Sequence, residues 1–289
     1  MIEFKNKSLQ ASFEKNGFAV LNLLDNQAIE LLIERYKDLE TLHNNKDPYL
    51  FSTLDNENLN LSKNVETIIQ DVCLPKINQE LRHFDYLFST YLIKKTSQNN
   101  PTPFHQDPTL VDNKESISAN IWIALEDTAI NKGSLRFIPG SHRIIDSLVV
   151  TPDFYTYYHT FQHKLKHYCV DIQLKKGQAV IFNNKLVHGA YANNSGKDRI
   201  AAVVAVKSTS SPWCYHYLAN KEKEGLVEKY YLNKDFYSTI KKNERPQSFL
   251  KKESFNFQFP SISYREFQLF MIKNYPKLAF KALVKSLFK

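Results

Sequence analysis

Two histidines and one carboxylate give the clearest chemical signal in the sequence. His105 and Asp107 lie two positions apart in the segment 104–108, and His188 follows an apolar run and an Asn-Asn-Lys turn. Residues i and i+2 of an extended segment point to the same side. Two imidazoles and one carboxylate suit non-haem Fe(II), because they leave adjacent coordination positions open for a chelating cosubstrate and dioxygen. We therefore predict an iron site at His105, Asp107 and His188.

Zinc is the alternative metal, because some zinc hydrolases also use two histidines and one carboxylate. Those enzymes commonly carry their histidines in an HExxH helix, which this sequence lacks. A surface turn beside prolines is the alternative for the pair His105 and Asp107. Another group, His159, His163 and His167, recurs every four residues and would line one face of a helix. We interpret that group as a solvated or interfacial face.

Arg199 stands at the start of a strongly apolar segment, 199–206, that is typical of a buried strand. A lone arginine before a strand is commonly a solvated cap. An arginine that points into the interior needs an anionic partner, because a buried unpaired guanidinium is costly. Arg199 is therefore a candidate anion-binding residue.

Apolar periodicity predicts helices before the metal-binding segments and strands around them. Helices are expected over residues 8–15, 25–39 and 65–82. Pro75 should kink or split the last of these. Short apolar runs bounded by turn residues predict strands over 86–95, 117–125, 134–138, 168–174, 178–182 and 199–206. Short strands without intervening helices indicate a jelly roll.

The predicted fold class is mainly β with flanking helices, built on a double-stranded β-helix, the cupin-like jelly roll. We expect one structural domain with three parts. These are a helical buttress over residues 1–83, a jelly-roll catalytic core over 84–216 and a basic helical extension over 217–289. The chain has 289 residues, of which 43% are hydrophobic and 24% charged, and this composition excludes disordered, collagenous and coiled-coil proteins.

The N-terminus and the cysteines bear on the cellular compartment. The first residues lack the apolar run and cleavage site of a signal peptide, and no apolar stretch is long enough for a membrane span. Cys73, Cys169 and Cys214 lie far apart and form no CxxC pair, which argues against a zinc knuckle or a disulfide framework. We expect a cytoplasmic protein with reduced thiols and no transmembrane segment.

The net charge of +8 is concentrated in the last quarter of the chain. Residues 220–289 hold 15 Lys or Arg and 7 Asp or Glu, which accounts for the whole excess. A basic tail on a neutral body favours an acidic partner or surface. It argues against nucleic acid, because nucleic-acid enzymes usually carry their positive charge around the active cleft.

A basic amphipathic helix is expected at the C-terminus, where Pro276 can occupy the first turn. Its lysines recur every four residues, and its apolar residues fall largely on the opposite side. The lysines are Lys273, Lys277, Lys281, Lys285 and Lys289, and the apolar residues are Phe280, Leu283, Val284, Leu287 and Phe288. We expect the apolar side to dock on the barrel or on a second subunit. The alternative is binding to an acidic carrier protein or an anionic membrane surface.

The order and spacing of five segments resemble the phytanoyl-CoA dioxygenase family of iron- and 2-oxoglutarate-dependent oxygenases. The resemblance covers about residues 10–215 and is specific because all five segments agree together. The matching segments are 92–95, 102–108, 121–127, 132–143, and His188-Gly189 followed by 193–199.

The resemblance implies the roles of four residues. His105, Asp107 and His188 would bind Fe(II), and Arg199 would pair with the distal carboxylate of 2-oxoglutarate. A guanidinium matches a carboxylate through two parallel hydrogen bonds. The cofactors implied are therefore Fe(II), 2-oxoglutarate as cosubstrate, and O₂.

The resemblance also implies weaker roles for further residues. Trp122 would help to wall the cosubstrate pocket, although a tryptophan in an apolar strand is more often plain core. Lys94 or Lys95 would supply a further polar contact. One departure from the family is Ala190, which stands where relatives often carry a hydroxyl group, so one hydrogen bond to 2-oxoglutarate is in doubt.

The reaction that the resemblance implies is hydroxylation of an aliphatic C–H bond in a small organic substrate, with release of succinate and CO₂. Asp107 favours hydroxylation over halogenation, because related halogenases have a small residue there; desaturation and ring closure stay open. The alternatives are a hydroxylase of a protein, carrier-bound or nucleic-acid substrate and an inactive jelly-roll binding protein.

Loops select the substrate in jelly-roll oxygenases. The candidate selectors are residues 43–62, 108–116 and 143–168, together with the C-terminal zone. The last of these loops carries an aromatic cluster that would either cover the substrate or pack on the barrel. The cluster consists of Phe154, Tyr155, Tyr157, Tyr158 and Phe161.

Overall fold

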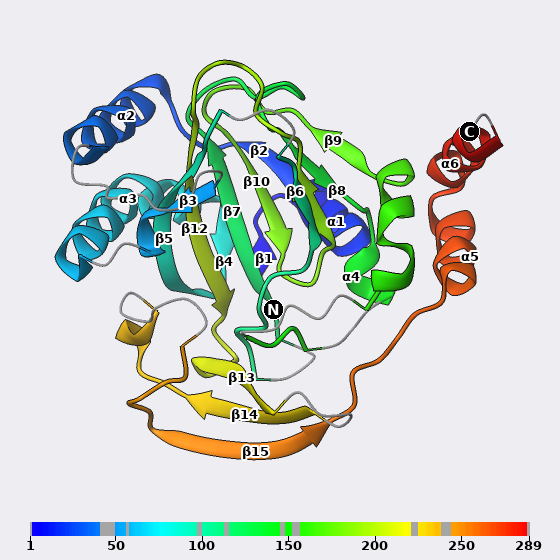
Figure 1. The fold of residues 1–289 in the computed structure, drawn as a ribbon. Helices are drawn as coiled ribbons and strands as arrows, with labels where there is room; N and C mark the ends of the chain where they lie inside the picture. The colour runs from blue at the N-terminus through cyan, green and yellow to red at the C-terminus, as the bar shows by residue number, and fades with distance from the viewer. Residues whose placement is uncertain are drawn as a thin grey trace.

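Two antiparallel sheets form the core of the protein and pack face to face around a shared apolar interior (Figure 1). The computed structural model describes residues 2–40, 50–55, 58–96, 100–112, 116–144, 148–151, 157–220, 225–237 and 244–287. Within these residues the mainly β architecture with flanking helices is as predicted.

The larger sheet has six strands in the order β2-β10-β7-β12-β5-β3, and the smaller has four in the order β6-β11-β8-β9. The larger sheet contains β2 (Phe18–Asn22), β10 (Gln178–Asn183), β7 (Ser118–Ala124), β12 (Arg199–Ser208), β5 (Phe84–Lys94) and β3 (Leu50–Ser52). The smaller sheet contains β6 (Thr102–His105), β11 (His188–Ala190), β8 (Leu135–Phe137) and β9 (Val170–Ile172). Strands lie at all six predicted positions, whereas β6 and β11 were not predicted.

Alternate residues of the larger sheet face two different environments. On β7, Ile121 and Ile123 pack against the helices, while Trp122 and Ala124 face the interior between the two sheets. The strands are buried on both faces and therefore consist of almost continuous apolar residues. This alternation decides which polar side chains can reach the interior.

The predicted helical buttress is present as α1 (Lys7–Asn16), α2 (Asn26–Glu40) and α3 (Leu59–Glu80). Pro75 does not split the third helix, which was one of the two predicted outcomes, because α3 is continuous through it. Every fourth residue of its inner face is completely buried, and this packing offsets the lost hydrogen bond. These residues are Val65, Ile69, Cys73 and Ile77. The buttress zone also contributes the strands β2 and β3 to the larger sheet.

The prediction of a helical extension from residue 217 is wrong for its first half. A separate antiparallel sheet consists of β13 (Cys214–Asn220), β14 (Gly225–Tyr231) and β15 (Lys251–Phe257). Lys229 of this sheet forms ion pairs with Asp112 and Glu253. Because charged residues interrupt the alternation of apolar and polar positions, the sequence showed no clear period-2 pattern here. Helices begin only with α5 (Tyr264–Asn274) and α6 (Pro276–Leu287).

The remaining elements are short. They are β1 (Glu3–Phe4), which pairs with β4 (Leu81–Arg82), the helix α4 (Ser141–Ile144) and the 3₁₀ helices η1 (Thr53–Asp55), η2 (His159–His167) and η3 (Lys234–Phe236). α5 and α6 lie at the edge of the molecule, beyond η2 (Figure 1). No helix in the described part of the chain combines the length and apolar character that crossing a bilayer requires.

Candidate metal centre and cosubstrate pocket

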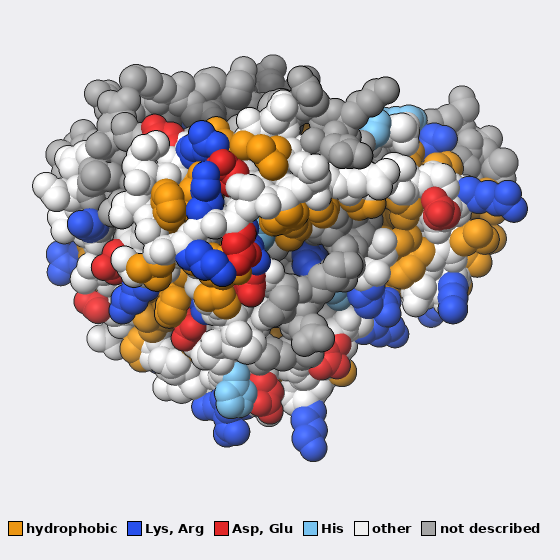
Figure 2. Space-filling model, turned by 90° about the horizontal axis from the view of Figure 1, so that it is seen from below, with side chains coloured by type: hydrophobic (Ala, Val, Ile, Leu, Met, Phe, Trp, Pro, Cys, Tyr) orange, Lys and Arg blue, Asp and Glu red, His pale blue; other side chains and the backbone are white. Residues whose placement is uncertain are grey.

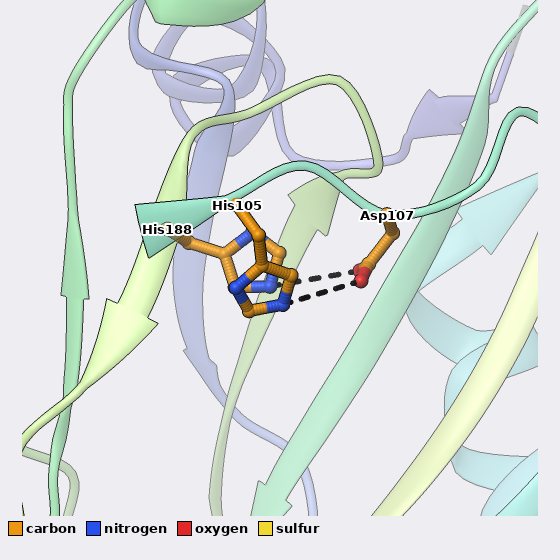
Figure 3. Close-up of side chains that lie close together, drawn as sticks. All are labelled: His105, Asp107 and His188. Carbon is orange, nitrogen blue, oxygen red and sulfur yellow. Dashed lines mark ion pairs between the residues drawn. The ribbon is translucent and has the colours of Figure 1, made fainter. Parts of the chain in front are cut away.

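Two neighbouring strands of the smaller sheet bring the three predicted ligands together. His105 ends β6 and lies directly opposite His188, which begins β11. Asp107 follows β6 by two residues, and its backbone amide donates a hydrogen bond to the carbonyl of Asn184 at 2.9 Å. Figure 3 shows both imidazoles and the carboxylate converging on one point between the sheets.

The distances within this triad fit a metal ion. Asp107 Oδ1 lies 3.7 Å from His105 Nε2, and Asp107 Oδ2 lies 3.7 Å from His188 Nε2. The candidate ligand atoms all lie within 4.8 Å of one another. This is the one such group of three or more metal-ligating side chains among the residues that the structure describes.

Hydrogen bonds fix the orientation of each ligand. His105 Nδ1 lies 2.8 Å from the carbonyl of Pro103, and His188 Nδ1 lies 2.9 Å from the carbonyl of Leu186. A proton on each Nδ1 leaves the Nε2 lone pair free to bind a metal. Asn120 Nδ2 donates to Asp107 Oδ2 at 2.7 Å. The sequence analysis missed Asn120, although it lies two positions before Trp122 and thus on the same face of β7.

The electrostatics also favour a metal. Burial lowers the pKa of His188 to about 4; His105 adds to the decrease and Asp107 opposes it. His188 is therefore neutral at physiological pH, the state in which imidazole binds metals.

Contrary to what the sequence had indicated, the other histidine group does not line one helical face. His159, His163 and His167 lie on the 3₁₀ helix η2, where a spacing of four residues does not define one face. His159 and His163 are exposed.

The two lysine candidates at the end of β5 point in opposite directions. Lys94 pairs with Arg199 across β5 and β12, so both side chains face the interior, and each is only 2% exposed. Lys95 is the next residue and forms an ion pair with Asp198 at 2.7 Å on the outer side. Of the two, the structure places only Lys94 near the interior.

Arg199 is a buried cation with few protein contacts. Its Nη1 donates to the carbonyl of Gly133, and its guanidinium lies 4.9 Å from the centre of the Trp122 ring. Its Nε and the indole Nε1 of Trp122 are buried without a hydrogen-bond partner in the described structure. Burial lowers the pKa of Arg199 to about 10 while Glu126 raises it, so the group is still charged at neutral pH.

The two buried cations meet at Gly133. Lys94 Nζ donates to Thr102 Oγ1 at 2.9 Å, and the Lys94 stem passes so close to Gly133 that an added Cβ would lie 2.8 Å from Lys94 Cδ. Gly133 also has a φ of +71°, which favours glycine. A buried guanidinium is costly unless an anion pairs with it. Arg199 therefore fits a carboxylate ligand.

A pocket of about 610 Å³ adjoins the triad. Its walls are formed mainly by apolar and aromatic side chains, with a few polar groups near the metal ligands. The lining includes Leu50, Ser52, Leu54, Asp55, Phe88, Thr102, Pro103, His105, Asp107, Pro108, Leu110, Asn120, Thr151, Asn184, Tyr215 and Tyr237. Residues from each predicted selector loop contribute, and Tyr237 comes from the C-terminal zone.

The predicted aromatic lid is largely packing. Tyr157, Tyr158 and Phe161 are at most 2% exposed and belong to an apolar cluster beneath α5 and α6. Tyr158 lies close enough to Asp107 that the carboxylate, after burial, raises the pKa of its phenol. Phe154 and Tyr155 lie outside the described residues.

A known protein family matches the part of the chain that contains these site residues. The profile of the family described as phytanoyl-CoA dioxygenase (PhyH) matches residues 13–201, well over half of the chain. This chain belongs to the phytanoyl-CoA dioxygenase family. The matched region includes His105, Asp107, His188 and Arg199. The predicted family resemblance is therefore confirmed.

Curated members of the phytanoyl-CoA dioxygenase family are similar to different extents. Phytanoyl-CoA dioxygenase domain-containing protein 1 of Danio rerio is 32% identical over 143 residues, which cover 45% of this chain and 46% of the relative. A phytanoyl-CoA dioxygenase of Arabidopsis thaliana is 27% identical over 128 residues, or 43% and 45% of the two chains. The match thus spans about half the length of these relatives. A Caenorhabditis elegans homologue of phytanoyl-CoA dioxygenase domain-containing protein 1 is 25% identical over 265 residues, which cover 68% of this chain and 89% of the relative.

Solved structures share the fold at low sequence identity. SnoK, a non-heme alpha ketoglutarate dependent carbocyclase from nogalamycin biosynthesis, has a TM-score of 0.57 and 17% identity, covering 72% of this chain and 86% of that one. AviO1 from Streptomyces viridochromogenes has a TM-score of 0.52 and 18% identity, covering 73% and 98%. The shared fold confirms the predicted jelly-roll class.

Proposed function

We propose that this protein is an Fe(II)- and 2-oxoglutarate-dependent oxygenase that hydroxylates an aliphatic C–H bond of a small organic molecule. The observation that carries the proposal is the buried guanidinium of Arg199. It stacks on Trp122 in the apolar cluster that His188 also contacts through Phe182. A metal triad alone would also suit a hydrolase. A triad joined to a buried cationic site suits a metal-bound ligand with a distal carboxylate.

Each proposed ligand has a residue to hold it. His105, Asp107 and His188 would hold the metal, with Asn120 fixing the orientation of the carboxylate. When bound, Fe(II) and 2-oxoglutarate supply the oxidising chemistry, in which O₂ is consumed and succinate and CO₂ are released. HygX of Streptomyces hygroscopicus, a structural neighbour with a TM-score of 0.51, was crystallised with nickel and 2-oxoglutarate.

The far end of 2-oxoglutarate would meet the two buried cations. Arg199 would bind the distal carboxylate, and Trp122 would cover one side of it through the ring that already stacks on the guanidinium. Thr102 lies opposite Ala190 across the sheet and is held by Lys94. Its hydroxyl would take the place of the group that Ala190 lacks. Lys95 has no such role, since it pairs with Asp198.

The pocket beside the triad would bind the primary substrate. Phe88, Leu110, Tyr215 and Tyr237 provide apolar walls, and Asn120 and nearby polar groups lie where a reacting carbon would approach the metal. A cavity of about 610 Å³ suits a small molecule rather than a folded protein segment or nucleic acid. The cytoplasmic location expected from the sequence stays a prediction.

The test is succinate formation from 2-oxoglutarate with Fe(II) and O₂, scanned across a library of small metabolites. A true substrate should raise succinate release above the uncoupled background and gain one oxygen atom in its mass spectrum. Asp107→Ala serves as the inactive control. Loss of two hydrogens from the substrate instead would assign desaturation or ring closure. If wild type releases no more succinate than Asp107→Ala under any condition, the proposed activity is wrong.

A further inference from the structure

The helices α5 and α6 form a hairpin whose outer face is unusually apolar. Five large hydrophobic side chains of the described residues are more than half exposed, and four of them lie in this hairpin. These are Leu269 at 57%, Ile272 at 58%, Phe280 at 68% and Leu283 at 53%, and the fifth is Leu250 at 68%. Such clustering marks an interaction surface, whereas scattered exposed residues do not.

The exposed residues are not a core left uncovered by poor packing. The opposite face of the hairpin is well buried against η2 and its surroundings through Phe267, Met271, Ala279 and Ala282. Ile272, Phe280 and Leu283 instead line one side of a pocket of about 230 Å³, whose other side includes the buried residues Tyr168 and Ala279. Phe280 and Leu283 therefore do not dock on the barrel, which was one of the two expected docking sites beside a second subunit. Leu287, Phe288 and Lys289 lie outside the described side chains.

Positive charge surrounds this apolar face. The hairpin carries five basic residues, all exposed, which are Arg265, Lys273, Lys277, Lys281 and Lys285. Its one acidic residue, Glu266, accepts hydrogen bonds from Ser263 in the capping box of α5. Figure 2 shows hydrophobic and basic side chains side by side at the edge of the molecule where this hairpin lies.

We propose that the α5–α6 hairpin binds the surface of an anionic lipid bilayer. Its exposed leucine, isoleucine and phenylalanine side chains would enter the boundary between headgroups and acyl chains, and the lysines around them would meet acidic headgroups. A second copy of this chain fits the face less well, because two copies would bring their lysines together. Binding of this kind holds the protein on the membrane without spanning it.

Flotation with lipid vesicles tests the proposal with the full-length protein. Vesicles of phosphatidylcholine with phosphatidylserine should bind it at least about tenfold more strongly than phosphatidylcholine alone, and added salt should weaken the binding. Phe280→Ser should lower binding by about tenfold. The double variant Lys277→Glu, Lys281→Glu should lower it at least as much.

Matched controls separate the hairpin from general effects. Leu250→Ser removes an equally exposed side chain outside the hairpin, and Lys63→Glu with Lys176→Glu makes the same change in net charge elsewhere. Both controls should bind vesicles more strongly than the hairpin variants do. Thermal melting of each variant should match that of wild type, because the substituted residues are exposed.

Three results would overturn the proposal. The first is no binding of wild type to anionic vesicles, or equal binding by Phe280→Ser and wild type. The second is self-association, measured by sedimentation, that Phe280→Ser abolishes while vesicle binding is absent. The third is binding to soluble polyglutamate without binding to vesicles, which would assign the surface to an acidic protein partner.

Discussion

The metal end and the substrate end of the site are built in different ways. The metal end consists of two histidines on paired strands and of Asp107, which follows the first strand by two residues. The imidazoles are held by carbonyl groups two positions earlier in the chain. The substrate end draws Phe88, Leu110 and Tyr237 from segments that lie far apart in sequence. Tyr215 and Tyr237 lie beyond residue 201, where the family match ends. The three candidate metal ligands therefore all lie within the region that matches the family, whereas part of the substrate end lies outside it.

Loss of a ligand should produce the largest effect. Asp107→Ala should weaken Fe(II) binding by more than about 100-fold, because even partners of metal ligands commonly account for about 10–100-fold. Anaerobic calorimetric titration measures the affinity. Asp71→Ala removes an exposed carboxylate on α3 and should bind iron like wild type. Undiminished iron affinity in Asp107→Ala would place the metal elsewhere.

Removal of the buried cation should come next. Arg199→Met should raise the 2-oxoglutarate concentration needed for half-maximal succinate formation by roughly 30- to 5,000-fold, because a buried charge-assisted contact contributes about 2–5 kcal/mol. Its affinity for Fe(II) should stay as in wild type. Lys95→Met is the matched control and should leave both quantities unchanged, since Lys95 pairs with Asp198. An equal loss in both variants would mean that Arg199 has no special contact with the cosubstrate.

Asn120 tests whether support of a metal ligand contributes to metal affinity. Asn120→Ala removes the hydrogen bond to Asp107 Oδ2 and should lower iron affinity by about 10-fold, less than loss of the carboxylate itself. Calorimetric titration again gives the value. Asn120→Ser, which retains a donor group, should recover part of the loss. Wild-type affinity in the alanine variant would show that Asp107 needs no support from β7.

A change at the substrate end should have the smallest effect on the cofactors. Phe88→Ala enlarges the pocket and should raise the KM for the substrate found by the succinate screen about 10-fold. Iron and 2-oxoglutarate affinities should not change. Weaker cosubstrate binding in Phe88→Ala would mean that the metal end and the substrate end are coupled.

The three candidate ligands were predicted from the two-residue spacing of His105 and Asp107 together with the family resemblance, which also supplied the role of Arg199. The structure brings His105, Asp107 and His188 together. β6 and β11 are too short to show any periodicity, so the strands that carry the histidines were missed. Lys94 and Lys95 could not be distinguished without the strand register, which sends one inward and the other outward.

The C-terminal part was less predictable for a different physical reason. On α6, small side chains face the core, because Ala279 and Ala282 allow close approach to η2, while Phe280 and Leu283 point outward. Large apolar residues usually face inward, so the side of α6 that carries Phe280 and Leu283 was expected to dock, whereas the structure buries Ala279 and Ala282. The strands β14 and β15 were not predicted for a related reason. Charged residues that form cross-strand ion pairs, such as Lys229 with Glu253, take the place of an apolar pattern there.

Binding of 2-oxoglutarate most directly tests whether the metal triad and Arg199 hold one ligand together. Anaerobic titration of 2-oxoglutarate into the wild-type protein, with Ni²⁺ in place of Fe(II), should show one molecule bound per chain. Omission of the metal should weaken that binding by at least about 10-fold, because metal and arginine hold the two ends of one ligand. Failure to bind 2-oxoglutarate in the presence of metal, or equal binding without it, would contradict the joint role of the triad and Arg199.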